Sequence, residues 1–180
     1  MSDERYYRIP HWAFLINWFN RPYIKARDMS YLTPIEKLLL PNEELLRNKF
    51  CNFVYRHPQA ERDHIFHEIK KYKHIDSGGR TLNNMGGWTV PGSHSAIEKI
   101  EFLSKYKFTI AGECASVPGY VTEKIVHAFS AGSIPIYWGS PEVTRDFNNK
   151  AFIFISDWKD VGEALDKIKE IDSSEKLYRE

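Results

Sequence analysis

Residues 107–139 read KFTIAGECASVPGYVTEKIVHAFSAGSIPIYWG, and the order of the segments within them is the clearest indication of the fold. Two short apolar segments, 107–113 and 133–139, are predicted to be strands. Between them, residues 121–132 are predicted to form a helix that begins at Thr122 and ends near Gly132, because glycine is a favoured helix terminator. A strand, a helix and a second strand in this order predict part of a parallel α/β sheet.

The alternation of strands and helices continues on both sides of this stretch. Further strands are predicted at residues 49–56 and 151–155, and further helices at 59–73, 93–106 and 157–171. The sequence therefore predicts a Rossmann-like α/β fold, with a parallel sheet flanked by helices on both faces. Ligands of such sheets bind outside the carboxyl ends of the strands, where the glycine-rich loop 74–88 and the loop 111–120 are expected to meet.

The pattern also predicts which side chains cap the helices and which point inward. Ser93 or Ser95 is expected to cap the helix 93–106, and Asp157 is expected to open the last helix. The side chains predicted to face the core are Ile65, Phe66 and Ile69 in one helix and Ile97, Ile100, Phe102 and Leu103 in the next.

Composition narrows the possible functions. The chain has 180 residues, enough for one domain or one domain with an appendage, and 42% of them are hydrophobic. A formal net charge of +1 argues against a general binder of nucleic acid. Cys51 and Cys114, the only two cysteines, give neither metal-ligand spacing nor a disulfide framework. No apolar run approaches the roughly 20 residues that span a bilayer, and the first ten residues lack a signal-peptide core, so a cytoplasmic protein is expected.

The first 48 residues differ from the rest. Trp12, Leu15 and Phe19 fall at helical spacing within an aromatic-rich segment, which predicts a short helix packed against another surface or, alternatively, lying at a membrane interface. Prolines then punctuate residues 20–48, apart from one helical piece, which predicts a linker or an extended wrap onto the core. The aromatic side chains near Trp12 and Trp18 are expected to face a further domain.

The start of the helix at Thr122 has the chemistry of an anion site. The Thr122 hydroxyl is expected to accept a backbone N–H of the first turn, where the helix dipole and unpaired N–H groups attract phosphate. Lys124 would strengthen that attraction, Glu123 could accept vicinal ribose hydroxyls, and Tyr120 could cover a sugar or base. Gly119 permits close backbone approach. From the residues alone, a dipole-stabilising glutamate beside a solvated lysine remains the alternative.

Several familiar nucleotide motifs do not occur in the chain. It contains no G-x-x-x-x-G-K-[ST] phosphate loop, no G-x-G-x-x-G and no Asp-x-Asp pair for a metal-bound diphosphate. A diphosphate site here would rely on cationic side chains and helix amides, with no metal and no cofactor.

Together these segments resemble the donor-binding half of bacterial α-1,3/4-fucosyltransferases. The resemblance rests on KIEFLSKYKFTIAGE (99–113), GYVTEKIVHAF (119–129) and IPIYWGSPEVTRDFNNKAFI (134–153) in this order, and on the upstream residues 49–84. Residues 6–12, YYRIPHW, resemble the crossover from that family's first domain.

The resemblance implies the C-terminal donor domain of a two-domain GT-B glycosyltransferase. Residues 1–48 would be the crossover segment and linker from an N-terminal acceptor domain that this chain does not include, and residues 49–180 the GDP-fucose-binding domain, shortened at its C-terminal end. The implied partners are GDP-fucose and, through the acceptor domain, an oligosaccharide. Protein or lipopolysaccharide glycosylation in bacteria, at the inner face of the membrane, is the expected setting.

The resemblance also implies roles for individual residues. Arg62 and Lys124 correspond to diphosphate ligands, Glu123 to a ribose-binding carboxylate, Tyr120 to a donor-contacting tyrosine, Glu113 to an acidic residue beside the donor sugar, and Arg80 to a residue of the donor loop. The chain departs from the family where Gly112-Glu113-Cys114 stands in place of Phe-Glu-Asn. A cysteine cannot supply the hydrogen bonds of the amide.

The implied reaction is transfer of fucose from GDP-fucose to a sugar hydroxyl with inversion at the anomeric carbon. The general base is expected outside this chain, so the chain alone is expected to be inactive. Two alternatives remain at this point: a non-catalytic nucleotide-sugar-binding module or truncated remnant, and a GT-B transferase that uses another donor.

Overall fold

The computed structural model describes residues 8–15, 46–91 and 96–179. The proposed caps Ser93 and Ser95, Trp18 and most of the predicted linker lie outside these residues. The described strands are β1 (Lys49–Phe53), β2 (Ile75–Ser77), β3 (Tyr106–Gly112), β4 (Ile134–Trp138) and β5 (Ile153–Ile155). The described helices are η1 (His11–Leu15), α2 (Ala60–Lys70), α3 (Ala96–Leu103), α4 (Glu123–Ser130), η4 (Pro141–Arg145), α5 (Gly162–Ser173) and α6 (Glu175–Arg179).

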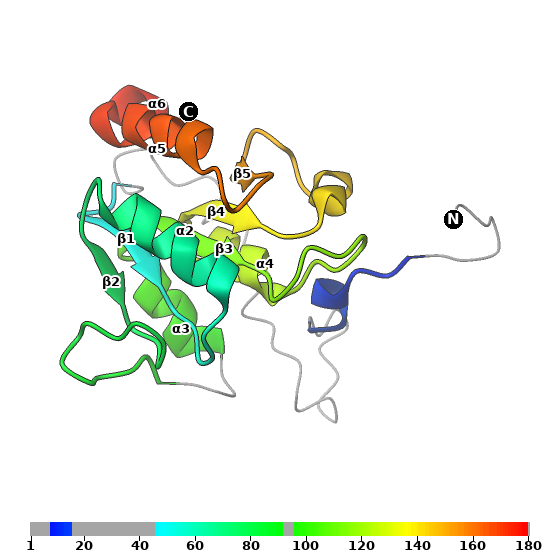
Figure 1. Ribbon diagram of the computed structural model, residues 1–180, viewed down its shortest axis with the longest axis horizontal. Coiled ribbons are helices and arrows are strands. Elements are labelled where there is room, and N and C mark those ends of the chain that lie inside the picture. Colours follow the sequence, from blue (N-terminus) through cyan, green and yellow to red (C-terminus); the bar gives the residue numbers. More distant parts are fainter. Residues whose placement is uncertain (1–7, 16–45, 92–95, 180) are drawn as a thin grey trace.

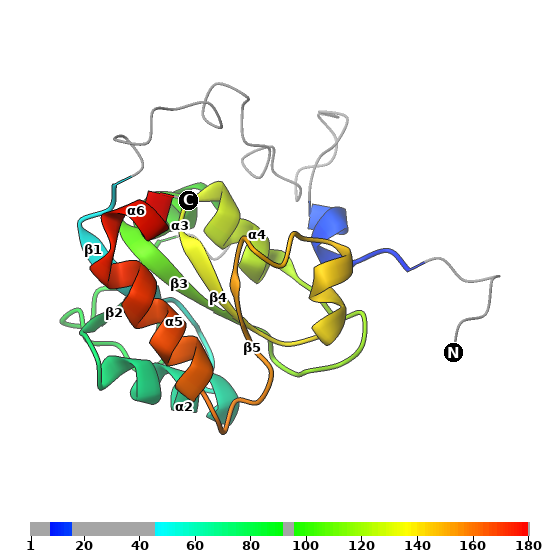
Figure 2. The same cartoon turned by 90° about the horizontal axis from the view of Figure 1, so that it is seen from above.

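The strands form one parallel sheet in the order β2-β1-β3-β4-β5. Helices α2 and α5 cover one face of the sheet, and α3 and α4 cover the other (Figures 1 and 2). The Rossmann-like sheet flanked by helices is therefore confirmed. In this strand order the connections leave β1 and β3 in opposite directions, so the carboxyl edge between these two strands is the expected ligand site.

The sheet is buried on both faces because its central strands carry mostly apolar side chains, as is typical of parallel sheets, and the buried Asn52 amide donates to the Thr109 hydroxyl. Phe108 and Ile110 of β3 pack with α2 and α5, whereas Ala111 packs with α4. The predicted inward face of α2 is confirmed, since Ile65, Phe66 and Ile69 are all buried.

In α3 the predicted inward face is only partly correct. Phe102 and Leu103 are buried and Ile100 packs beside them, but Ile97 is 48% exposed. Ile97 lies in the first turn of a helix of eight residues, before the helix meets the sheet. Gly132 does follow the end of α4 with a positive φ of 65°, as the sequence predicts.

Two boundaries differ from the sequence-based prediction. Residues 75–77, predicted as part of a loop, form β2, because Ile75 pairs with Cys51 and is fully buried at the end of the sheet. Asp157 does not open the last helix, since α5 begins at Gly162. The Asp157 carboxylate instead accepts the backbone N–H of Lys159 at 2.9 Å in a tight turn.

Helix η1, in the described N-terminal segment, packs against α4 (Figure 2). The Trp12 ring packs at a tilt against Phe147, with the ring centroids 5.4 Å apart, and its indole N–H donates to Asp146 at 3.2 Å. Trp12 therefore packs on this domain but is only half-buried, and the expectation that it faces a further domain stays a prediction. Among the described residues, no helix is both long and apolar enough to cross a membrane.

Candidate functional site

The carboxyl edge of β1 and β3 gathers most of the residues singled out from the sequence. Arg62 approaches from the first turn of α2, and Glu113 follows β3 directly. Glu123 and Lys124 begin α4, which packs on β3 and β4. The topology thus brings two cations and two carboxylates to one edge.

Glu113 is a fully buried carboxylate that holds the start of α4. One oxygen accepts the backbone N–H of Thr122 at 2.7 Å, and the other accepts the Thr122 hydroxyl at 2.7 Å and the Lys124 ammonium at 3.0 Å. The prediction that the Thr122 hydroxyl caps the helix by accepting an N–H is therefore wrong. The hydroxyl donates to Glu113, because this buried carboxylate is the stronger acceptor.

Lys124 is enclosed by oxygen acceptors. Its ammonium nitrogen lies 2.8 Å from the Thr122 hydroxyl, 3.0 Å from Glu113 and 3.5 Å from Glu123. Burial alone would lower the pKa of Lys124, but the charges of Glu123 and Glu113 outweigh it and raise that pKa above its usual value. Burial acts to raise the pKa of Glu123, yet Lys124 and Lys99 outweigh it and lower that pKa. Both groups are therefore charged at neutral pH.

Arg62 is a buried cation, with 4% of its surface exposed. Its guanidinium lies over the ring of Tyr55 at 4.2 Å and donates to the His57 carbonyl at 3.0 Å and to the Cys114 sulfur at 3.7 Å. Its Nε is buried without a hydrogen-bond partner. Gly112 permits this position, since a Cβ there would lie 2.8 Å from the Arg62 side chain.

The departure at Cys114 is visible in this contact. The exposed Cys114 thiol is only a weak acceptor for Arg62, whereas the asparagine that the sequence resemblance implies at this position would offer a carbonyl oxygen. Part of the donor capacity of Arg62 is thus weakly used, which leaves it available to an anion at this edge.

Tyr120 and Arg80 lie on exposed loops beside this edge. Tyr120 is 37% exposed and follows Gly119, which has a φ of 80°. Arg80 is exposed and makes no hydrogen bond or ion pair with the rest of the described chain. Its neighbour Gly79 lies so close to the backbone of Tyr55 that a Cβ there would overlap it, so the glycine-rich loop is docked on the end of β1.

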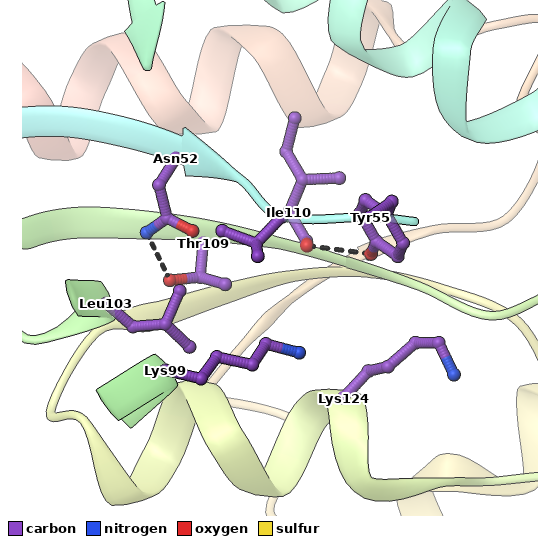
Figure 3. A pocket seen from close by; sticks show the side chains of 8 residues that line it. Asn52, Tyr55, Lys99, Leu103, Thr109, Ile110 and Lys124 are labelled. Carbon is purple, nitrogen blue, oxygen red and sulfur yellow. Dashed lines mark hydrogen bonds between the residues drawn. The ribbon is translucent and has the colours of Figure 1, made fainter. Parts of the chain in front are cut away.

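Lys99 is a residue of this region that the sequence-based prediction missed. It projects from α3 into a small pocket beneath β1 and β3, which Lys124 enters from α4 (Figure 3). Burial lowers the pKa of Lys99 to about 8, against the opposing effect of Glu123. In the sequence Lys99 stands between Glu98 and Ile100 in a predicted helix and resembles a solvated surface lysine, so no pattern distinguishes it.

Over the described ranges, no three or more His, Cys, Asp and Glu side chains lie together so that they could hold a metal ion. The charged atoms at this edge are instead the ammonium and guanidinium groups of Arg62, Lys99 and Lys124, facing the carboxylates of Glu113 and Glu123.

Comparison with known proteins identifies the family. Residues 47–180 match the model of the glycosyltransferase family 10 (fucosyltransferase) C-terminal region. The chain is 37% identical to the alpha-(1,3)-fucosyltransferase FucT of Helicobacter pylori over 98% of its own length and 40% of the relative's. It is 29% identical to the human GDP-fucose protein O-fucosyltransferase 3 over 84% of its length and 32% of that protein's.

Solved structures agree in fold. A crystal structure of an alpha1,3-fucosyltransferase with GDP matches with a TM-score of 0.68 and 35% identity, over 80% of this chain and 40% of that one. A second, with GDP-fucose, matches with a TM-score of 0.65 and 34% identity over the same shares. The chain thus spans about 40% of the length of the first of these relatives. On the family model and these identities, the chain belongs to glycosyltransferase family 10, the fucosyltransferases.

Proposed function

We propose that this chain forms the donor site of an α-1,3/4-fucosyltransferase and binds GDP-fucose. The observation that carries the proposal is the arrangement of Arg62, Glu123 and Lys124 at the carboxyl edge of β1 and β3, where α4 begins. Two similar crystal structures are of an alpha1,3-fucosyltransferase with GDP and with GDP-fucose, which supports the same donor here.

The site suits a diphosphate next to a ribose. Arg62 keeps an unpartnered Nε and a weak contact to Cys114, so it can turn donors towards a phosphate without losing strong bonds. Glu123 is 28% exposed at the side chain and ionised, as bidentate acceptance of two ribose hydroxyls requires. Tyr120 and Arg80, exposed on the flanking loops, are placed to cover the nucleotide.

In the proposed reaction an acceptor hydroxyl attacks the anomeric carbon of fucose while the bond from that carbon to the GDP oxygen breaks. Configuration inverts in this single displacement. The leaving phosphate gains negative charge, which the fixed charges of Arg62 and Lys124 stabilise. The acceptor proton goes to a carboxylate. Because Glu113 and Glu123 are both paired with Lys124, we place this base in the part of the enzyme that binds the acceptor, in keeping with a two-domain GT-B architecture.

Isothermal titration calorimetry of the chain with GDP, GDP-fucose, UDP and ADP tests the donor assignment. GDP and GDP-fucose are expected to bind, and UDP at least about tenfold more weakly, a difference of about 1.4 kcal/mol. Equal affinity for UDP and GDP would show another donor specificity. Binding of none of the four nucleotides would leave a decayed remnant as the better interpretation.

A further inference from the structure

Lys99 occupies a position that the proposed donor chemistry does not yet use. Its side chain extends from α3 beneath β1 and β3, in the direction in which these strands run, and so towards their carboxyl edge (Figure 3). Lys124 enters the same pocket from α4. Both lysines therefore line one small space, in which the Lys99 side chain points towards Lys124, while the Lys124 ammonium is held by Glu113 and Thr122. The residues that line the pocket are Asn52, Val54, Tyr55, Lys99, Leu103, Thr109, Ile110 and Lys124.

Lys99 differs from Lys124 in how its charge is balanced. Lys124 contacts three oxygen acceptors. Lys99 makes no hydrogen bond or ion pair with another described residue, although its side chain is partly buried. An ammonium group that is withdrawn from water without an acceptor is costly, and an anion in the pocket would remove that cost.

The groups that act on Lys99 come from three elements. The carboxylates of Glu123, at the start of α4, and of Glu113, after β3, favour its charged form. Lys124 and Arg62 disfavour it, and burial disfavours it most. His127 of α4 also interacts with this group: burial lowers the pKa of His127, and the charge of Lys99 lowers it further. This surplus of cations over carboxylates points to an anionic ligand.

We propose that Lys99 is a third cation of the donor site, which binds the diphosphate together with Arg62 and Lys124. The proposal rests on the donor assignment above. A lysine has three donors and no acceptor, so it selects phosphate oxygens over the hydroxyl groups of the ribose. Its place on α3 would fix the diphosphate from the side opposite to Arg62, which stands on α2 and so on the other face of the sheet.

Binding of a diphosphate at Lys99 should change the number of protons bound to the chain. With a pKa of about 8 in the unliganded chain, Lys99 is about half neutral at pH 8. A bound diphosphate favours the charged form and raises this pKa, so binding at pH 8 should take up about half a proton. Affinity for GDP should accordingly fall as pH rises through 8 towards 9, because more of the unliganded Lys99 must be protonated before it can bind.

Calorimetry of GDP binding at pH 8.0, in two buffers of different ionisation enthalpy, measures this uptake directly. The chain is expected to take up about half a proton. Lys99→Met should bind GDP about tenfold or more weakly, with uptake near zero, as expected for one lost charge-assisted hydrogen bond. Lys105→Met, which removes an exposed lysine just after α3, should match the unaltered chain in both affinity and uptake.

Lys99→Arg separates charge from packing. Arginine stays protonated at pH 8, so this variant should keep most of the affinity but lose the proton uptake. It also serves if Lys99→Met does not fold, which circular dichroism would reveal. The role of Lys99 would be overturned if Lys99→Met bound GDP with unchanged affinity and proton uptake, or if Lys99→Arg kept the full proton uptake. In either case, GDP binding by the unaltered chain would still support the donor assignment. Failure of the unaltered chain to bind GDP would instead contradict the donor assignment itself.

Discussion

At the scale of single residues, the site depends on a buried carboxylate that also stabilises the fold. The Glu113 carboxylate accepts three hydrogen bonds: from the backbone N–H of Thr122, from the Thr122 hydroxyl and from the Lys124 ammonium. The family resemblance implies that this position lies next to the donor sugar, a role that stays a prediction. Its buried contacts indicate that it also fixes the first turn of α4, and so the direction in which Glu123 and Lys124 point.

Sequence could predict the members of the site better than their hydrogen bonds. Thr122, Glu123 and Lys124 were expected at the start of a helix, and they are found there. That Thr122 donates to Glu113 could not be expected, because the two residues are nine positions apart and meet only through the fold. Lys99 was missed for the same reason, since only α4 and the sheet convert a helix-surface lysine into a desolvated one.

Lys124→Ala should weaken GDP binding about 10- to 150-fold, because one charge-assisted hydrogen bond to phosphate contributes about 1.5 to 3 kcal/mol. Calorimetry at pH 7, where Lys99 is charged, measures the change. Lys150→Ala, on an exposed turn far along the chain, is the matched control and should bind normally. A folded Lys124→Ala chain with unaltered affinity would reduce Lys124 to a partner of Glu113.

At the scale of elements, the periodic segments were predictable and their ends were not. The strands around 107–113 and 133–139 and the helix between them appear nearly where the pattern puts them. The three-residue strand β2 is too short for a periodic signal, and only its pairing with β1 defines it. Asp157 has the right chemistry for a cap, but it forms a turn with Lys159 and the helix begins five residues later.

Arg8 joins the N-terminal segment to the rest of the domain through ion pairs with Asp146, at 2.7 Å, and with Glu142, at 3.8 Å. Arg8 donates to both carboxylate oxygens of Asp146, at 2.7 and 2.8 Å, and more weakly to the Gly119 carbonyl at 3.3 Å. Trp12 donates to the same carboxylate and, through its backbone, to Val121. Residues before the linker thus support the loop that leads into Glu123 and Lys124.

Asp146→Ala should therefore lower the free energy of unfolding by about 1.5 to 3 kcal/mol, the contribution of a hydrogen bond to a charged group. For a chain of this size that corresponds to a fall in melting temperature of about 2 to 4 °C per kcal/mol. Thermal unfolding at pH 7 measures it. Asp166→Ala is the control, since the side chain of Asp166 is 80% exposed.

The effect of Asp146 should also depend on pH. Burial acts to raise the pKa of Asp146, but hydrogen bonds from Arg8 and Trp12 outweigh it and hold that pKa below its usual value. A carboxyl group with a lowered pKa in the folded state stabilises the fold above its unfolded pKa of about 3.9, and this contribution disappears as pH falls through the folded pKa. The stability difference between the unaltered chain and Asp146→Ala should shrink below about pH 4. A difference that stays constant down to pH 2 would mean that the ion pair contributes nothing.

At the scale of the whole molecule, fold and family could be predicted from sequence because the motifs of the donor edge come in one order along one parallel sheet. The strand order explains why the candidate ligand-binding residues gather at that edge. The chain continues from β1 into α2 on one face of the sheet, and from β3 into α4 on the other face. The resemblance alone could not show how the charges balance there. The structure brings three cations, Arg62, Lys99 and Lys124, to an edge that holds only the two carboxylates of Glu113 and Glu123.

The last prediction is that this polypeptide of 180 residues binds GDP-fucose without transferring fucose. The matched family model describes a C-terminal region, and the chain spans about 40% of its first relatives. Orientation of an acceptor can supply about 7 to 11 kcal/mol of a barrier, and a general base about 10²- to 10⁴-fold in rate. Glu113 and Glu123 are committed to Lys124, so neither can take the acceptor proton without breaking the site. A transfer assay with GDP-fucose and N-acetyllactosamine, run beside an N-terminally extended polypeptide, should give turnover only in the extended form. Turnover by the 180 residues alone would place the base among them, and loss of that turnover in a Glu113→Gln chain that still binds GDP normally would identify Glu113 as the base.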